Sequence, residues 1–406
     1  MKNKYLYITI YVLALMYLSC GEPFKESKIK LVLTGSVHGQ LDPCGWKKNP
    51  LGGLSRKYVK IKEMRENGES PIILDAGDMF FSTANLNSNN IKSEKHRCET
   101  MLSAYEKIGC DGLNIGKYEL LAGVSYLKTL SERYPKIPFL SANIRDKKTK
   151  DLIFSPYKII SRENATLGII GLTDMVPDTM NSILVDDYII TGNRFIKKLK
   201  NDVDIIVMLI NSDRSSHNTL PSKFENADYI IVSGSTNRTS PTAPQKNGGP
   251  FLYSNGKQGK YLNVIDLELN NSSSPIVDVS SYEQKIRQLN NRLKRLQKKD
   301  PQKSLEEIYS NQENILNLIK RYRNDLEKAD SSLSTAVNRM KFSSIALNKR
   351  IKDDPEILAM VDNAIETCST LNLNAPKIPK RPKSRPNKKR NKARKLPKST
   401  KVKTKQ

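Results

Sequence analysis

The sequence predicts an α/β fold in which two mixed sheets form a layered sandwich flanked by helices. Across residues 29–270, short apolar segments alternate with segments of helical period. Several apolar segments end in a polar turn, which is typical of buried strands that deliver residues to a site at their C-terminal ends. Alternation at this spacing favours a layered α/β architecture over an all-β or an all-helical protein.

Each strand is predicted from a run of aliphatic residues bounded by turn-forming residues. The predicted strands span 30–34, 71–75, 137–142, 166–171, 203–210, 228–233, 250–254 and 261–268. The predicted helices lie between them and include 53–67, 95–109 and 191–201.

The sequence after Asn270 predicts helices rather than strands. Apolar residues recur there at alternating spacings of four and three, with positions skipped in the second helix, which is the heptad pattern of a coiled coil. They are Tyr282, Ile286, Leu289, Leu293 and Leu296, and, after a break at Asp300 and Pro301, Leu305, Ile308, Ile315, Ile319, Tyr322, Leu326 and Leu333. We predict an antiparallel coiled-coil hairpin over 278–340, serving either as a structural arm or as a surface for self-association or a protein partner.

Two further segments complete the C-terminal part. We expect a short helical cap over 341–370. Residues 376–406 are almost devoid of apolar side chains and predict a disordered basic tail. The net charge is +26, but fifteen cations lie in 377–405, so the remainder carries only +11. This moderate charge does not predict binding to nucleic acid.

The N-terminus predicts export. A cationic start and an apolar stretch indicate a signal peptide over 1–19, too short for the ~20 residues of a membrane-spanning helix. The stretch stops at Cys20 in a sequence that resembles a bacterial lipoprotein cleavage box. We predict a lipid on Cys20, a linker over 20–28 and a location at the cell envelope, outside the cytoplasm. An ordinary signal peptide and an uncleaved anchor are the alternatives.

Partners follow from this location. The membrane would be reached through lipidated Cys20, and anionic envelope polymers through the basic tail. The remaining cysteines, Cys44, Cys98, Cys110 and Cys368, are even in number. In an oxidising compartment they allow three disulfide connectivities, and two or more could instead be buried thiols.

Four short motifs lie at the ends of predicted strands. They are Gly35-Ser36-Val37-His38, Gly77-Asp78, Gly116-Lys117-Tyr118-Glu119 and Gly234-Ser235-Thr236-Asn237. In order and spacing they resemble the N-terminal domain of the bacterial periplasmic 5′-nucleotidases, within the calcineurin-like metallophosphatases. That family reads Asp-x-His, Gly-Asp, Gly-Asn-His-Glu, an isolated His, then Gly-His-x-His. The resemblance implies a metallophosphatase-like fold for 29–270.

The resemblance also implies that most metal ligands are replaced. The family uses two metal ions ~3.5–4 Å apart, with a bridging carboxylate. Only His38 and Asp78 keep the residue types of direct ligands. The replaced positions are Ser36, Lys117, Tyr118, Asn211, Ser235 and Asn237. Two ligands cannot hold a metal pair, so we expect no cofactor, with a single divalent ion as the alternative. His217 is expected to be exposed in a loop.

A second cluster follows the first predicted strand. Residues 43–46 and 52–56 resemble a Pro-Cys-Gly-Cys and Gly-Gly-Leu-Ala-Arg element of an exported subgroup of these proteins. Trp46 replaces the second Cys, and the chain has no Cys-x-x-Cys-His, so haem attachment is excluded. Together with Glu119 of the Gly116-Lys117-Tyr118-Glu119 motif, this cluster defines a candidate cleft of Cys44, Trp46, Gly52, Gly53, Arg56 and Glu119. The glycine pair either approaches an anion or only forms a tight turn.

Three functions remain open on the sequence. The first is a non-catalytic envelope lipoprotein that uses a metallophosphatase-like core as a binding or scaffold module. The second is a divergent metal-dependent phosphoester hydrolase of 5′-nucleotidase type. The third is thiol or redox chemistry at Cys44, whose pKa nearby cations would lower.

Overall fold

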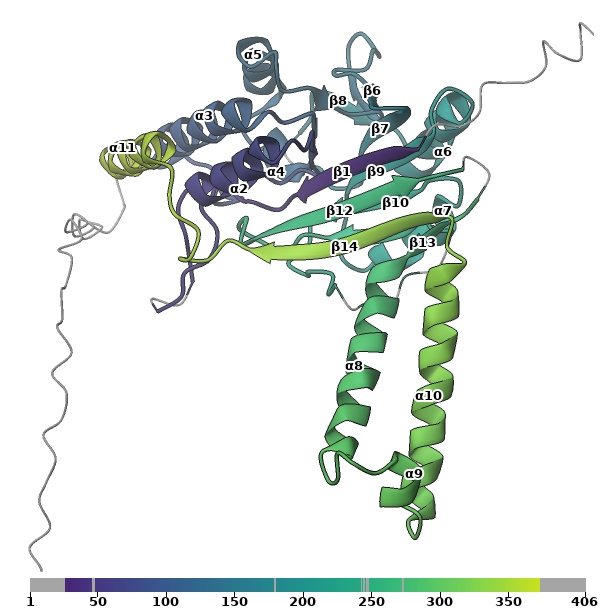
Figure 1. Cartoon of the computed structure of the whole chain (residues 1–406). Coiled ribbons are helices and arrows are strands. Elements are labelled where there is room, and N and C mark those ends of the chain that lie inside the picture. Colours follow the sequence, from purple (N-terminus) through teal and green to yellow (C-terminus); the bar gives the residue numbers. More distant parts are fainter. Residues whose placement is uncertain are drawn as a thin grey trace, which may run out of the picture. The chain divides into compact units, whose positions relative to one another are not determined.

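The computed structural model describes residues 26–372 apart from 46–47, 179, 242, 244, 246–247 and 272–273 (Figure 1). The predicted signal peptide, Cys20, Trp46 and the basic tail lie outside the described residues. Their assignments therefore stay predictions.

A seven-stranded mixed sheet forms one layer. Its strand order is β13-β14-β12-β1-β2-β3-β4. The strands are β1 (Ser27–Thr34), β2 (Ile72–Asp75), β3 (Gly112–Asn114), β4 (Phe139–Leu140), β12 (Tyr261–Leu269), β13 (Ile276–Asp278) and β14 (Asn338–Ala346). Strand β1 pairs parallel with β2 and antiparallel with β12, so the parallel strands β1 to β4 meet the antiparallel β12–β14 pair at β1.

A five-stranded mixed sheet forms the second layer, with the order β11-β10-β9-β7-β6. Its strands are β6 (Tyr157–Arg162), β7 (Ala165–Thr173), β9 (Ile205–Asn211), β10 (Tyr229–Ser233) and β11 (Phe251–Ser254). Only the β6–β7 pair is antiparallel. A small ladder joins β5 (Ile144–Asp146) to β8 (Ile183–Val185).

The core lies in three layers because side chains alternate along each strand. Leu31 and Leu33 of β1 join the cluster between the sheets, which also contains Val207 and Leu209 of β9. Val32 faces the opposite side and packs with the helices that cover the larger sheet. This arrangement confirms the predicted α/β sandwich of two mixed sheets.

Helices cover the outer face of each sheet (Figure 1). Over the seven-stranded sheet lie α2 (Leu54–Glu66), α3 (Ile91–Ile108), α4 (Lys117–Leu120), α5 (Val124–Arg133) and α11 (Pro355–Leu371). Over the five-stranded sheet lie α6 (Tyr188–Leu199) and α7 (Leu220–Lys223), with the 3₁₀ turn η1 (His217–Thr219) before α7. Within the described part of the chain, no helix is long and apolar enough to cross a membrane.

The hairpin is an insertion between two strands of the larger sheet. It comprises α8 (Val279–Gln297), α9 (Leu305–Ile308) and α10 (Glu313–Ser334), and it connects β13 to β14. Helices α8 and α10 lie side by side (Figure 1), and the Lys285–Asp325 ion pair at 3.5 Å joins them. A small apolar cluster around Ile319 closes the far end with α9. The antiparallel helix pair is as predicted, and its coiled-coil packing stays a prediction.

Two predicted elements differ from the structure. The predicted strand 137–142 contains only β4 at Phe139–Leu140. In the predicted helical cap 341–370, residues up to Ala346 instead continue β14, which pairs with β12 from Arg339 to Ala346. The period-two pattern around buried Met340 and Phe342 and exposed Lys341 is that of a strand. The sheet therefore extends beyond the predicted domain boundary at 270, and only α11 fits the helical part of the expected cap.

Candidate functional site

Two loops are held together at the C-terminal ends of β1 and β2. The backbone N–H groups of Ser36, His38 and Gly39 donate to the carbonyls of Gly77, Asp78 and Met79 at 2.8, 2.9 and 2.8 Å. We call loops 35–39, 77–80, 116–119 and 234–237, with Asn211, the strand-end site.

Backbone strain is concentrated at this site. Ser36, His38 and Asp78 have φ angles of 50°, 49° and 56°. Side-chain-bearing residues in the left-handed region cost of the order of 1–3 kcal/mol each, and they gather at functional sites. The surrounding hydrogen bonds impose these conformations and aim His38 and Asp78 at one region.

Asp78 is buried, and its carboxylate is already engaged by the chain. Its Oδ1 accepts the N–H of Tyr118 at 3.1 Å. Burial raises the pKa of Asp78, the charge of Asp75 adds to the rise, and the Tyr118 N–H opposes it.

Glu119 organises the loops around Asp78. This buried carboxylate accepts N–H groups from Asp78 at 2.9 Å, Met79 at 2.7 Å, Phe80 at 3.3 Å and Gly116 at 2.9 Å. Burial raises the pKa of Glu119, and the Asp78 charge raises it further. Four backbone donors make Glu119 a positioning residue that fixes the turn carrying Asp78.

The His38 ring packs against the ring of Tyr118. The rings of His38 and Tyr118 meet edge to face with centroids 4.5 Å apart. Burial lowers the pKa of His38 to about 4. The charge of Asp75 opposes this shift, and the charge of Lys257 adds to it. Within the described residues its buried Nδ1 has no hydrogen-bond partner. His38 is therefore a neutral imidazole at pH 7, and its Nδ1 is unpaired within the described residues.

Several positions that the resemblance predicts to be replaced ligands make hydrogen bonds within the protein. Asn211 is buried, accepts the Lys117 N–H at 2.9 Å through Oδ1, and donates through Nδ2 to Ser233 Oγ at 2.7 Å. The hydroxyl of Ser36 accepts the Gly234 N–H at 3.3 Å.

The 234–237 motif is also hydrogen-bonded within the protein. Ser235 Oγ accepts the Asn237 N–H at 3.1 Å. The structure thus brings His38, Asp78 and the replaced positions together, and these replacements brace loops.

The donor set does not fit a pair of metal ions. At the motif positions singled out in the sequence, His38, Asp78 and Glu119 are the only His or carboxylate side chains, and the ammonium-bearing Lys117 follows Gly116 directly. Among the described residues, no three His, Cys, Asp or Glu side chains are grouped so that they could hold a metal ion. Two ligands leave most of the coordination shell of even one divalent ion unfilled.

The expectation for His217 was wrong. His217 is buried rather than exposed, because η1 folds it back over the end of β9, where its Nε2 lies 3.1 Å from the carbonyl of Ser212. Burial lowers its pKa. Flanking polar residues in the sequence did not reveal this packing.

The second cluster is mainly structural. Cys44 and Leu51 exchange backbone hydrogen bonds of 2.9 and 3.0 Å, and Gly52 donates to the Leu347 carbonyl at 2.9 Å. A Cβ on Gly53 would lie 2.9 Å from the Pro43 ring. Glycine here therefore serves the tight turn.

Arg56 and Cys44 also differ from expectation. Buried Arg56 donates through Nη1 to the carbonyls of Pro50 and Leu347 at 3.0 and 3.2 Å, so its guanidinium ties loops together. Burial raises the pKa of Cys44, although Lys260 opposes the rise. Nearby cations therefore do not give Cys44 the lowered pKa that a reactive thiol needs. The described cysteines, Cys44, Cys98, Cys110 and Cys368, are free thiols.

Two buried polar networks behind the site were not foreseen. In the first, Lys57 donates to the Tyr105 hydroxyl at 2.6 Å, and Tyr105 donates to Asp75 at 2.9 Å. Burial lowers the pKa of Lys57 to about 8, against the attraction of Asp75. Lys57 directly follows the 52–56 element and Tyr105 lies within α3, and only polar residues within apolar helix faces hinted at this network.

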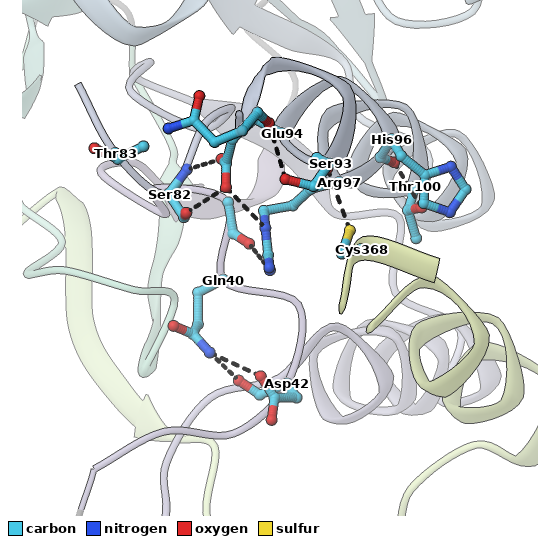
Figure 2. Close-up of polar contacts among 12 residues, drawn as sticks. Gln40, Asp42, Ser82, Thr83, Ser93, Glu94, His96, Arg97, Thr100 and Cys368 are labelled. Atoms are coloured by element: carbon cyan, nitrogen blue, oxygen red, sulfur yellow. Dashed lines mark hydrogen bonds and ion pairs between the residues drawn. The ribbon is translucent and has the colours of Figure 1, made fainter. Parts of the chain in front are cut away.

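The second network braces the loop that follows His38 (Figure 2). Arg97 of α3 donates to the Gly39 carbonyl at 3.1 Å and lies 3.6 Å from Glu94, which accepts from the backbone and hydroxyl of Ser82. A Cβ on Gly39 would lie 2.6 Å from the Phe80 carbonyl oxygen. The close approach of this loop to residues 80–82 and to the Arg97 side chain requires glycine.

Comparison with known proteins agrees with this fold. No protein-family model matches the sequence. The chain is 24% identical over 298 residues to Protein UshA of Salmonella pullorum, covering 63% of this chain and 52% of that protein. It is 23% identical over 285 residues to the 5′-nucleotidase of Rattus norvegicus, covering 62% and 48%. The chain thus spans about half the length of these curated relatives.

Solved structures give the same answer for the fold. The 5′-nucleotidase precursor of Thermus thermophilus matches with a TM-score of 0.58 and 13% identity, over 85% of this chain and 59% of that one. The calcineurin-like phosphoesterase YfkN of Bacillus subtilis matches with a TM-score of 0.54 and 16% identity, over 85% and 98%. The fold is that of the calcineurin-like phosphoesterases. The sequence is related to the 5′-nucleotidases.

Proposed function

We propose that this chain is a non-catalytic relative of the 5′-nucleotidases that acts as a binding or scaffold module outside the cytoplasm. The observation that carries the proposal is the internal pairing of the replaced ligand positions. Asn211 accepts from Lys117 and Ser36 accepts from Gly234, each in a neighbouring loop, whereas Ser235 accepts from Asn237 within its own loop. They keep the shape of a phosphoesterase site and supply no imidazole or carboxylate to a metal ion.

The names of the relatives favour the alternative, a divergent metal-dependent phosphoester hydrolase. They are called 5′-nucleotidases, and activity is often shared among relatives. Shared fold alone does not carry chemistry across, however, because function depends on the residues of the site. Here that set is reduced to His38 and Asp78, which is why we favour binding over turnover.

Phosphoesterase assays and metal analysis test the proposal. The purified full chain should contain no stoichiometric metal pair, and added Mn²⁺ or Zn²⁺ should produce no turnover of nucleotides or phosphodiesters. The matched control is Asp78→Ala, which separates activity of this site from a contaminant. Metal-dependent turnover that Asp78→Ala abolishes would show that the chain is an enzyme.

We propose in addition that the chain is lipid-anchored through Cys20. The sequence pattern of a signal peptide ending at this cysteine supports the proposal. Each buried CH₂ of an acyl chain contributes ~0.8 kcal/mol, so several chains would hold the protein at the membrane. Mass spectrometry should find lipid on Cys20, and Cys20→Ser should move the protein to the soluble fraction. An unmodified N-terminus elsewhere would contradict this.

The basic tail is proposed to bind anionic polymers or headgroups of the envelope. Each Lys or Arg near an anionic surface contributes ~1 kcal/mol, and salt screens the attraction. Binding of the full chain to anionic vesicles should exceed that of a chain truncated after Ala375, and the excess should fall with added salt. Equal binding would mean that the tail only keeps the protein soluble.

A further inference from the structure

The first described residues are fixed to the turn between β6 and β7. In this turn Asn164 donates its N–H to Ser27 Oγ at 3.1 Å and its Nδ2 to the Glu26 carbonyl at 2.9 Å. The Lys28 N–H donates to Glu163 Oε2 of the same turn at 3.3 Å. These contacts hold the start of β1 beside the start of β7. We call this end of the domain the strand-start end.

The strand-end site lies at the other end of the same strand. Strand β1 has eight residues, from Ser27 to Thr34, and loop 35–39 of the site follows it directly. At ~3.3 Å per residue the strand spans ~26 Å. Strand β9 also ends in the site, at Asn211. The strand-start end and the strand-end site are therefore separated by the length of a strand.

The base of the helical hairpin lies at the strand-start end. Across the larger sheet, Ser27 lies opposite Leu269 of β12. The neighbouring Glu268 lies opposite Arg339, near the beginning of β14, and β14 is the strand that follows the hairpin. The register of the sheet thus places the base of the hairpin at the same end of the sheet as the beginning of β1.

The predicted lipid on Cys20 limits how the domain can be oriented on a membrane. Glu26 follows Cys20 by six residues. A chain spans at most ~3.6 Å per residue, so Glu26 stays within ~22 Å of an acylated Cys20. Turning the strand-end site toward the lipid would raise Glu26 by the ~26 Å of β1, and by the loops of the site in addition. The linker is too short for that orientation.

We propose that the strand-start end, with the base of the hairpin, faces the lipid surface that holds Cys20, and that the strand-end site points away from it. The inference rests on the proposed lipid anchor and is independent of whether the site is catalytic. A headgroup of the same membrane then cannot reach His38 or Asp78. Whatever the site binds comes from the aqueous space beyond that membrane.

Energy transfer from a dye on the protein to an acceptor on lipid headgroups tests the proposal. The lipidated full chain is placed in phosphatidylcholine vesicles at high salt, which screens contacts of the basic tail. Cys44→Ser removes the half-buried thiol, and the other described cysteines are buried. The dye is attached through Asn201→Cys, just before β9, or through Lys257→Cys, and both positions are exposed. Lys257 marks the strand-end site because the next residue, Gln258, donates its N–H to the Ser36 carbonyl at 2.8 Å.

Transfer should be about twofold or more stronger from Asn201 than from Lys257, because a strand length of ~26 Å separates the two ends. The difference should shrink when about twelve Gly and Ser residues are inserted before Glu26, since a longer flexible linker lets the domain turn. The matched control Cys20→Ser should lose transfer from both positions. If a labelled variant is destabilised in urea, Val337→Cys at the base of the hairpin and Ser215→Cys after β9 form a second pair.

Each outcome decides the question. Stronger transfer from the strand-start position of either pair, reduced by the longer linker, supports the proposal. Equal transfer from both ends with the native linker, or stronger transfer from the strand-end position, would overturn it. A Cys20 that mass spectrometry finds without lipid would refute the anchor and this inference together. That result would leave the non-catalytic assignment intact, which only metal-dependent turnover would refute.

Discussion

The strand-end site and the hairpin both use a glutamate to hold the start of a helix, but by different means. Glu307 accepts the N–H and hydroxyl of Ser304, three residues away, in an exposed capping box. Glu119 is buried and accepts N–H groups of Gly116 and of the distant loop 78–80. The hairpin is therefore held by local sequence, and the strand-end site by contacts between distant segments.

The largest expected effect is on the stability of the strand-end site. Glu119→Ala would leave four buried N–H donors without acceptors and should lower the free energy of unfolding by about 5 kcal/mol, at ~1–3 kcal/mol for each unsatisfied group in a partly relaxed site. Glu307→Ala should cost much less, because water can replace this exposed carboxylate at the helix start. Urea unfolding of both variants measures the difference. Equal losses would remove the contrast between the two regions.

The second prediction concerns the pH dependence of stability. The pKa of His38 is about 4 in the folded chain and 6.5 as the ordinary value. The unfolded chain thus binds more protons between these values, and stability should fall as pH drops from 6.5 to 4. The shift corresponds to about 3 kcal/mol at pH 4.

His38→Gln tests this directly. The unfolding free energy of the variant should depend less on pH between 6.5 and 4 than that of the parent. The substitution should change the unfolding free energy less at pH 8 than at pH 4. Parallel profiles for parent and variant would show that His38 does not stay neutral in the folded protein.

The third prediction is that the hairpin can unfold locally while the two sheets stay folded. Ile319 belongs to a small cluster with Leu305 and Tyr309. Ile319→Ala should cost about 2 kcal/mol, at the low end for a core truncation because so few residues pack there. Hydrogen exchange should accelerate in α9 and α10 and stay unchanged in β9 and β10. Acceleration throughout both sheets would mean that hairpin and core unfold together.

The smallest effect is expected for an exposed ion pair. Arg323 pairs with Glu306 across the hairpin, and this hydrogen bond lowers the pKa of Glu306. Glu306→Gln should cost about 0.5 kcal/mol, since solvent screens the pair. The loss should shrink as salt is added or as pH falls below the ordinary carboxyl range. A loss comparable to that of Glu119→Ala would contradict the assignment of hairpin stability to local apolar packing.

Much of the fold could be predicted because its signals are local. The apolar runs of β1, β9 and β10, and the heptad spacing of α8 and α10, each lie within one stretch of sequence. Strand β14 was misassigned because its period-two pattern follows a helical segment, and the partner that makes it a strand, β12, lies more than seventy residues earlier. The order of motifs likewise indicated that His38, Asp78 and Asn211 would meet at strand ends.

The sequence by itself determined which chemical groups are present at the motif positions, and from these it predicts that most imidazole and carboxylate ligands are replaced. Only the tertiary structure decided what the replacements do. It turned Asn211 into a brace for Lys117, buried His217, and left His38 Nδ1 without a partner. The physical reason is that hydrogen bonding, burial and the resulting pKa depend on segments that meet only in three dimensions.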